Sequence, residues 1–361
     1  MPRRLTLACL AVLIAACEDQ ALPTDPLQPG FNPGASAAAF SVMSRNIYVG
    51  ADLDAVIAAL LSPDPTDDGP ALAATIATLQ ATDFGARAVA LAREVAQHRP
   101  MAIGLQEVST ITLPTAGGPV VLDYLAGLQA ALAAAGLDYT VVASIVNVDV
   151  QIPVAPGVAV GLVDRDVLLV RGDVPVLGAT QGNYQAEIPL GFTTLRRGWV
   201  SADLHVAGRT VRVVSTHPES GPGLSAVVRE AQVTELMSLL SGWTGPLAVI
   251  GDMNGIPGSA SYNVLASAGL VDAWESLRPG ELGLTCCHTP DLSNPTAAGF
   301  DQRLDQIFVR NGFLTGNGGV IPASRVQLTG ANPAEKVAGP LYPIWPSDHA
   351  GIVAGLLFGG Q

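Results

Sequence analysis

Residues 247–254 read LAVIGDMN, an apolar run that passes directly into polar residues. A short apolar run bounded by turn residues is typical of a buried β-strand. The strand predicted over 247–250 therefore delivers Asp252 and Asn254 to its end. Ligands gather at such strand ends in α/β proteins, so these two side chains are candidate functional residues.

Other apolar runs also adjoin polar residues. Three of them end as the first one does: 40–44 before Arg45-Asn46, 101–105 before Gln106-Glu107, and 211–215 before Thr216-His217. Near the C-terminus, Asp305 precedes the strand-like residues 307–309, and Asp348-His349 precede the apolar run 352–358. We expect the polar ends of these strands to meet on one rim of the protein.

Helices are expected between the strands. Residues 84–98 carry apolar positions at helical spacing, with Asp83 as a cap, and residues 122–135 are rich in Ala and Leu. A third helix is expected after Arg229. The alternation of strands and helices, and the spread of polar positions over 46–349, predict one α/β domain.

The composition excludes a disordered chain and argues against tight binding of nucleic acid. Of the 361 residues, 49% are hydrophobic and only 14% are charged, the reverse of a disordered chain. The formal net charge is −13, and Lys336 is the only lysine. A protein that binds nucleic acid tightly by neutralising phosphates would show a basic stripe, and none is visible.

The N-terminus has the pattern of an export signal. Arg3 and Arg4 precede an uncharged run, Leu5 to Ala16, which is too short to span a bilayer. This run ends in small residues before Cys17, as in a bacterial lipoprotein that is cleaved and lipidated at the cysteine. An ordinary secretory signal is the alternative, and both place the protein outside the cytoplasm.

The sequence therefore divides into three parts. Residues 1–16 are the expected signal peptide, residues 17–39 carry the lipidated Cys17 on a flexible Pro/Gly/Ala-rich tether, and residues 40–361 form the domain. No later stretch is apolar enough for a transmembrane helix. The predicted location is the cell envelope, with a lipid anchor in a membrane.

Two adjacent cysteines, Cys286 and Cys287, remain in the domain. A vicinal disulfide and a pair of thiols are both compatible with the sequence. A zinc site that also uses His288 is not expected, because no neighbouring cysteines have the usual zinc spacing.

Three carboxylates, on Glu107, Asp252 and Asp348, adjoin apolar strand sequence. Burying such charges without a partner is costly, and a cation is the simplest compensation. Oxygen ligands favour Mg²⁺, Mn²⁺ or Ca²⁺ over zinc. Each of these residues alone is compatible with a turn, a cap or an ion pair, so the prediction depends on their joint order.

Amides and histidines complete the polar set. Asn46 and Asn254 can bind a phosphate oxygen or a water without adding charge. His217 and His349 are candidates for proton transfer or for binding a phosphoryl oxygen, and Asp305 is a candidate to orient one of them. Together these residue types are suited to metal-assisted attack of water on phosphorus.

In this order, the motifs resemble the endonuclease/exonuclease/phosphatase superfamily, which includes secreted deoxyribonucleases, neutral sphingomyelinases and inositol-polyphosphate phosphatases. The matching segments are Arg45-Asn46-Ile47, Leu105-Gln106-Glu107, Ser215-Thr216-His217, Gly251-Asp252-Met253-Asn254, Arg303 to Phe308 and Ser347-Asp348-His349. The resemblance implies a four-layer α/β sandwich of two packed, mostly antiparallel mixed β-sheets flanked by helices.

The resemblance also implies roles for these residues. Glu107 would be the main Mg²⁺ (or Mn²⁺) ligand, with Asn46 beside it and Asp348 adding metal or water contacts. The remaining residues would be catalytic: Asp252 positions water or protonates the leaving group, Asn254 holds the phosphate, Asp305 orients His349, and His217 matches the members with a strand-end histidine.

Some features depart from the family pattern. Asp52, in a long first turn, is a candidate for an additional metal contact or a cap. Residues 164–166 are interpreted as a bend before a strand, with Arg165 as a minor candidate for substrate contact. Arg196 and Arg197 are the better candidates for binding a substrate phosphate, although a solvated strand end also explains them.

These features predict a monomeric, metal-dependent phosphodiesterase outside the cytoplasm, with nuclease-type activity as the first interpretation. A sphingomyelinase-like or phosphoinositide phosphoesterase is the alternative, which a membrane anchor would suit. An inactive binding module is the third possibility, and the complete polar set argues against it. The expected substrate is a phosphodiester in nucleic acid or in a lipid headgroup.

Overall fold

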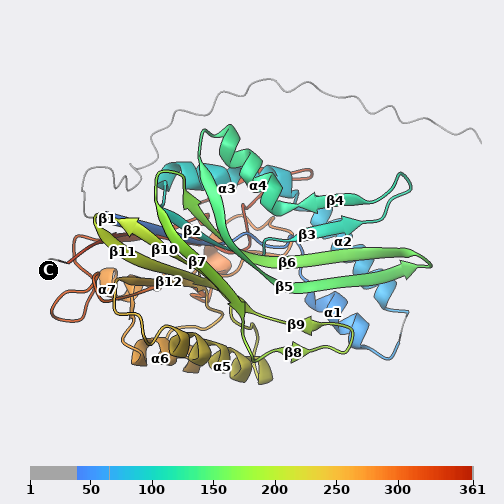
Figure 1. The fold of residues 1–361 in the computed structure, drawn as a ribbon. Coiled ribbons are helices and arrows are strands. Elements are labelled where there is room, and N and C mark those ends of the chain that lie inside the picture. Colours follow the sequence, from blue (N-terminus) through green and yellow to red (C-terminus); the bar gives the residue numbers. More distant parts are fainter. Residues whose placement is uncertain (1–38, 65, 360–361) are drawn as a thin grey trace, which may run out of the picture. The chain divides into compact units, whose positions relative to one another are not determined.

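The computed structural model describes residues 39–64 and 66–359, and Figure 1 shows their fold. Two β-sheets pack face to face, and helices cover their outer faces. The signal sequence, Cys17 and nearly all of the tether lie outside the described residues. The predicted sandwich of two mixed sheets flanked by helices is confirmed.

The first sheet has eight strands in the order β15-β18-β1-β2-β6-β3-β4, and β5 pairs with β6 outside this path. β1 and β2 are parallel, whereas the other pairs are antiparallel. The strands are β1 (Ala39–Asn46), β2 (Ala102–Gln106), β3 (Thr110–Leu113), β4 (Val120–Asp123), β5 (Tyr139–Ala155), β6 (Val158–Arg171), β15 (Arg325–Thr329) and β18 (Gly351–Leu357).

The second sheet has six strands in the order β13-β14-β12-β11-β10-β7. Its one parallel pair is β11 and β12. The strands are β7 (Val176–Asn183), β10 (Gly198–Val206), β11 (Arg209–Thr216), β12 (Leu247–Asp252), β13 (Val271–Asp272) and β14 (Asp305–Arg310). Two small pairs lie apart: β8 (Ile188–Pro189) with β9 (Thr194–Leu195), and β16 (Val337–Ala338) with β17 (Pro343–Ile344).

Apolar side chains from both sheets form the central core, including Phe40, Leu168, Val213 and Ile307. Helices α3 (Phe84–His98) and α4 (Tyr124–Ala134) cover the first sheet, and α5 (Leu224–Leu239) and α6 (Ala260–Ser267) cover the second (Figure 1). The remaining helices are α1 (Asp54–Leu61), α2 (Asp68–Ala81), α7 (Ala273–Leu277) and short 3₁₀ turns at Ala297–Gly299 and Pro333–Glu335.

Local sequence explains where these helices begin. The Asp83 carboxylate accepts a hydrogen bond from the Gly85 N–H at 3.0 Å, which caps α3 as predicted. The helix expected from residue 122 begins at Tyr124, because the preceding residues pair with β3 and Asp123 caps the helix. The third helix begins at Leu224, before Arg229.

The prediction of a bend at residues 164–166 is wrong. These residues continue β6 and pair with β5. Alternate residues of a strand face the same side, so Asp164 and Asp166 share a face while Arg165 points away. Among the described residues, no helix is long and apolar enough to cross a membrane.

Candidate active site

The strand topology brings the polar strand ends together. β1 runs parallel to β2, with Asn46 beside Gln106, and β11 runs parallel to β12, with Thr216 beside Gly251. Parallel strands end at the same edge of their sheet, so the residues that follow them share a rim. A Cβ atom at Gly251 would clash with the carbonyl oxygen of Thr216, so glycine allows this close approach.

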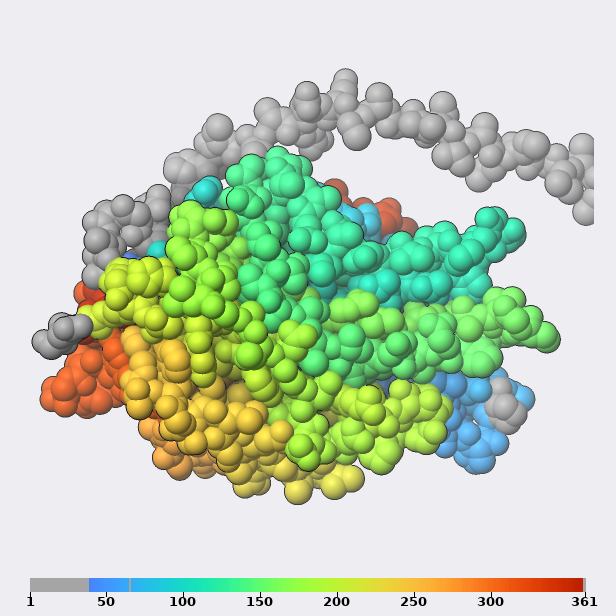
Figure 2. Space-filling view, viewed as in Figure 1, coloured from blue at the N-terminus to red at the C-terminus, as the bar shows by residue number. Residues whose placement is uncertain are grey.

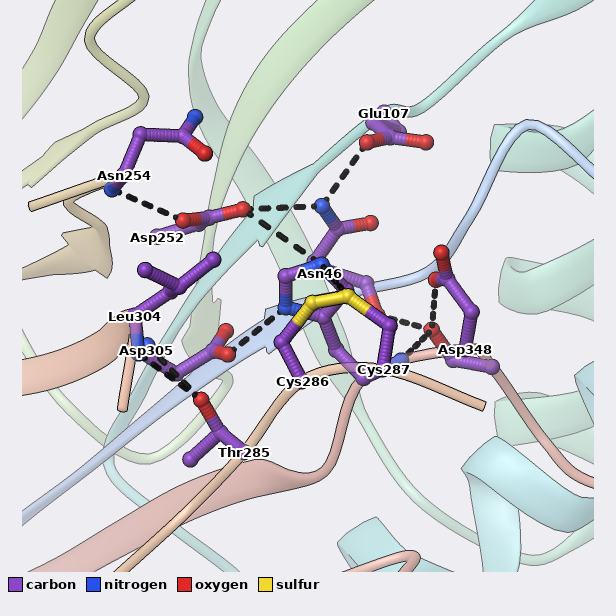
Figure 3. Close-up of a disulfide and its surroundings, with 12 residues drawn as sticks. Asn46, Glu107, Asp252, Asn254, Thr285, Cys286, Cys287, Leu304, Asp305 and Asp348 are labelled. Carbon is purple, nitrogen blue, oxygen red and sulfur yellow. Dashed lines mark hydrogen bonds and ion pairs between the residues drawn. A yellow bond between two sulfur atoms is a disulfide. The ribbon is translucent and has the colours of Figure 1, made fainter. Parts of the chain in front are cut away.

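Asn46 lies between two of the predicted carboxylates (Figure 3). Its amide nitrogen donates to Glu107 Oε1 at 2.8 Å and to Asp252 Oδ2 at 3.2 Å, and its oxygen accepts from the N–H of Tyr48 at 2.9 Å. Glu107 Oε2 accepts from the N–H of Val49 at 2.8 Å. As placed, Asn46 connects a candidate metal ligand to a candidate catalytic carboxylate.

His349 contacts two carboxylates on opposite sides of its ring. Nδ1 lies 2.8 Å from Asp305 Oδ2, and Nε2 lies 3.8 Å from Asp252 Oδ2. Thr285 Oγ1 accepts from the N–H groups of Leu304 and Asp305, which fixes the start of β14. Burial opposes the imidazolium, but Asp305 and Asp252 outweigh it and raise the pKa of His349 well above its ordinary value.

His217 lies beside the same Asp252 carboxylate. Its Nε2 is 3.5 Å from Asp252 Oδ2, and its Nδ1 is 3.6 Å from Asp166 Oδ1. Burial and the neighbouring Arg197 oppose the charged ring, but the two carboxylates outweigh them and raise the pKa of His217. Asp252 thus has an imidazole on each side.

Asn254 lies just beyond Asp252. Its backbone N–H donates to Asp252 Oδ1 at 3.0 Å, and its side-chain amide donates to the carbonyl of Pro218 at 3.0 Å. The first of these bonds occupies the Asp252 oxygen that points away from the histidines. Asn254 therefore lies within the same group of residues.

Glu107 and Asp348 both face one cleft. Burial and the nearby Glu107 carboxylate, opposed by His349, raise the pKa of Asp348 to about 7. The Ser347 hydroxyl donates to the carbonyl of Asn46 at 2.7 Å, which joins the segment before β18 to the end of β1.

The donor set fits a hard divalent cation. The carboxylates of Glu107, Asp252 and Asp348 are balanced locally by two histidines and by neutral N–H donors. The buried guanidinium of Arg87 is engaged by the carbonyls of Ile47 and Tyr48. Carboxylate oxygens are the ligands that hard divalent cations prefer, and Glu107 and Asp348 are the residues that would hold such an ion.

The two candidate phosphate-binding arginines lie in different surroundings. Arg197 lines the cleft, is bonded to Glu219 at 3.3 Å, and has Nη1 3.3 Å from His217 Nδ1. Arg196 is exposed, pairs with Glu187 at 3.1 Å and does not line the cleft. The two arginines lie between β9 and β10, and their side chains have different partners.

Two minor candidates have local partners. Asp52 Oδ1 accepts a hydrogen bond from the N–H of Asp54 at 2.9 Å, but the N-cap of α1 is Leu53, and Asp52 also lines the cleft. Arg165 donates to the hydroxyl of Thr110 at 2.8 Å on the side away from the site.

The sequence reasoning missed Asp164 and Asp166. Both are buried, and Asp166 lies against His217, whereas Asp164 accepts a hydrogen bond from Ser109 at 3.0 Å. The signal was present, because two aspartates at a spacing of two residues lead into the apolar run 167–170. Interpreting them as a bend instead of a strand concealed their shared face.

Cys286 and Cys287 form a disulfide across a cis peptide bond, which resolves the alternatives left by the sequence. Cys287 Sγ lies 3.9 Å from His349 Nε2, and Figure 3 shows the disulfide among the candidate site residues. His288 turns away and stacks on Trp345, with ring centroids 4.0 Å apart. The two sulfurs are bonded to each other.

The chain belongs to the Endonuclease/Exonuclease/phosphatase family, whose profile matches residues 76–349. Members of this family are hydrolases of phosphodiesters or phosphate esters and generally depend on divalent metals. The family resemblance seen in the sequence is therefore confirmed. No curated protein matches the chain.

Solved structures share the fold. Truncated TDP2 from Caenorhabditis elegans is 18% identical, with a TM-score of 0.52 over 88% of this chain and 97% of that one. The endonuclease/exonuclease/phosphatase from Beutenbergia cavernae is 20% identical, with a TM-score of 0.54 over 90% of this chain and 72% of that one. The mannosyl-6-phosphatase of Bacteroides thetaiotaomicron is 19% identical, with a TM-score of 0.51 over 88% of this chain and 100% of that one. At these identities the likeness concerns the fold alone.

Proposed function

We propose that this protein is a Mg²⁺- or Mn²⁺-dependent phosphodiesterase. The observation that carries the proposal is the position of Asp252, whose carboxylate lies 3.5 Å from His217 and 3.8 Å from His349. Glu107 is joined to the same carboxylate through Asn46. A candidate proton-transfer group and a candidate cation ligand therefore border one reaction centre.

Each residue has a part in the proposed hydrolysis. Asp252 orients the attacking water, which needs an acceptor close to the phosphorus. His349, held by Asp305, binds a phosphoryl oxygen or exchanges a proton with it, and Asn254 and His217 hold the remaining phosphate oxygens. The cation, when bound at Glu107 and Asp348, supplies Lewis-acid stabilisation of the phosphoryl charge.

The test uses a generic phosphodiester as the substrate. The purified protein should hydrolyse bis(p-nitrophenyl) phosphate in Mg²⁺ or Mn²⁺, lose turnover after exhaustive chelation, and recover it when the metal is restored. Full turnover after chelation would contradict the proposed metal dependence. An inactive protein that binds metal normally would favour the binding-module interpretation.

We also propose that the enzyme acts outside the cytoplasm as a lipoprotein anchored through Cys17. The uncharged run before Cys17 supports this location. The Cys17→Ser protein should fail to label with radioactive palmitate and should leave the membrane fraction or remain unprocessed. An intact Met1 on protein recovered from the cytosol would contradict the proposal.

A further inference from the structure

We propose, building on the proposed function, that the substrate is an amphiphilic phosphodiester of the phospholipid class. Its apolar chain would lie in the cleft beside the candidate catalytic carboxylates. The cleft has a volume of about 440 Å³, within the range of ~300–1,000 Å³ typical of small-molecule sites. Glu107 and Asp348 belong to its wall, so a chain in the cleft would be continuous with a phosphate at the metal site.

Three uncharged segments contribute much of the apolar wall of the cleft. They are residues 55–62 in and after α1, residues 150–163 of the β5–β6 hairpin, and residues 188–195 of the β8–β9 hairpin. Side chains that line the cleft from these segments include Val56, Leu60, Val150, Ile152, Leu190 and Phe192. Binding of a hydrocarbon chain to apolar side chains of this kind is favourable, because it removes apolar surface from water. These side chains have no groups that could hydrogen-bond a hydrated sugar or phosphate.

The same segments expose apolar side chains to solvent. Leu61 is 53% exposed, Val154 46%, Val158 38% and Phe192 42%. Figure 2 shows the tip of the β5–β6 hairpin projecting from the body, beside the β3–β4 hairpin. Exposed apolar groups around an apolar cleft are typical of a surface that meets lipid.

The charges of the cleft oppose a nucleic-acid strand. Its ionisable lining consists of six carboxylates and one guanidinium, together with His288 and Tyr48. These charged residues are Asp52, Asp54, Glu107, Asp164, Glu219 and Asp348, with Arg197 as the cation. A strand carries one phosphate per nucleotide and would be repelled along this wall, whereas a phospholipid presents a single phosphodiester at the metal site.

The test is a series of alkyl p-nitrophenyl phosphodiesters, from methyl to octyl, each below its micellar concentration. The bond that breaks is the same throughout, so hydrolysis of the methyl ester measures the proposed function alone. Burial of one methylene corresponds to about a threefold to fourfold change in affinity. We expect KM to fall by about that factor per methylene while kcat stays constant.

Cleft variants and a surface control separate a specific site from general hydrophobicity. Phe192→Asp and Val150→Asp should flatten the dependence of KM on chain length. The control is Leu224→Asp, because Leu224 is 70% exposed at the start of α5 and does not line the cleft. A wild-type KM independent of chain length, or an equal effect of the control, would overturn the inference.

Two further measurements distinguish failure of the inference from failure of the proposed function. Calorimetric titration with hexylphosphocholine and dodecylphosphocholine in chelator should show tighter binding of the longer chain without turnover. Chain-dependent binding by a protein that never hydrolyses the methyl ester would reject only the proposed function. A kcat/KM for single-stranded DNA above that for phosphatidylcholine vesicles would reject the lipid substrate.

Discussion

Asp305 and His349 are 44 positions apart in the chain, and the structure places His349 Nδ1 2.8 Å from Asp305 Oδ2. Asp305 begins β14 in the second sheet, whereas His349 lies just before β18 in the first. The contact therefore joins the two sheets at their polar edge. It forms only when the sandwich is assembled, so the imidazole is oriented by the packing of the whole domain.

His349→Ala should lower kcat by ~10²–10⁴-fold, the usual cost of losing a positioned proton-transfer or electrostatic group. The measurement is turnover per folded molecule, with the folded fraction determined by circular dichroism. His205→Ala is the matched control, because His205 is exposed on β10. A loss of less than tenfold for His349→Ala would remove this residue from the mechanism.

Glu107→Gln should weaken metal activation while leaving the fold intact. The glutamine keeps the shape of the side chain but removes the charge that a divalent cation requires. We expect the Mg²⁺ concentration for half-maximal activity to rise by at least tenfold in a metal titration. Glu230→Gln, on the exposed face of α5, is the control, and an unchanged titration for Glu107→Gln would place the ion elsewhere.

Glu94→Gln should destabilise the protein. Arg45 Nη2 lies 2.9 Å from Glu94 Oε1, both side chains are buried, and Arg45 also donates to the carbonyl of His349. Removing one charge of a buried pair leaves the other uncompensated, at a cost of about 3–5 kcal/mol. Urea unfolding should show this loss, whereas Glu281→Gln in the exposed Arg278–Glu281 pair should have no measurable effect.

Acid should destabilise the protein partly through His288. Burial against Trp345 and Phe300 lowers the pKa of His288 to about 3, compared with 6.5 for an unperturbed histidine. The unfolded chain then binds more protons between these values, so stability is full above pH 6.5 and falls toward pH 3. Because of this group, the free energy of unfolding should change by up to about 1.4 kcal/mol per pH unit in this range.

The matching measurement compares wild type with His288→Phe, which keeps an aromatic ring beside Trp345. The free energy of unfolding of the wild type should fall more steeply between pH 6 and pH 4 than that of the variant. Equal slopes for the two proteins would show that His288 titrates normally in the folded state.

Local sequence was sufficient to predict the strands that carry the candidate site. The mainly apolar runs before Asn46, Glu107, His217 and Asp252 each form a strand of the core, because a short apolar run between turn residues gains most by burial. The order of the polar residues also indicated the family. These features depend on neighbours in the chain, which a sequence shows directly.

Tertiary structure decided the features that depend on which side a residue faces. Asp166 lies against His217 because of its place on β6, whereas Arg197 lines the cleft and Arg196 pairs with Glu187 in the segment between β9 and β10. The apolar cleft combines one helix and two hairpins that are distant in sequence. The physical reason is that side-chain facing and long-range packing are fixed only when both sheets are in place, whereas strand formation is already favoured by local hydrophobicity.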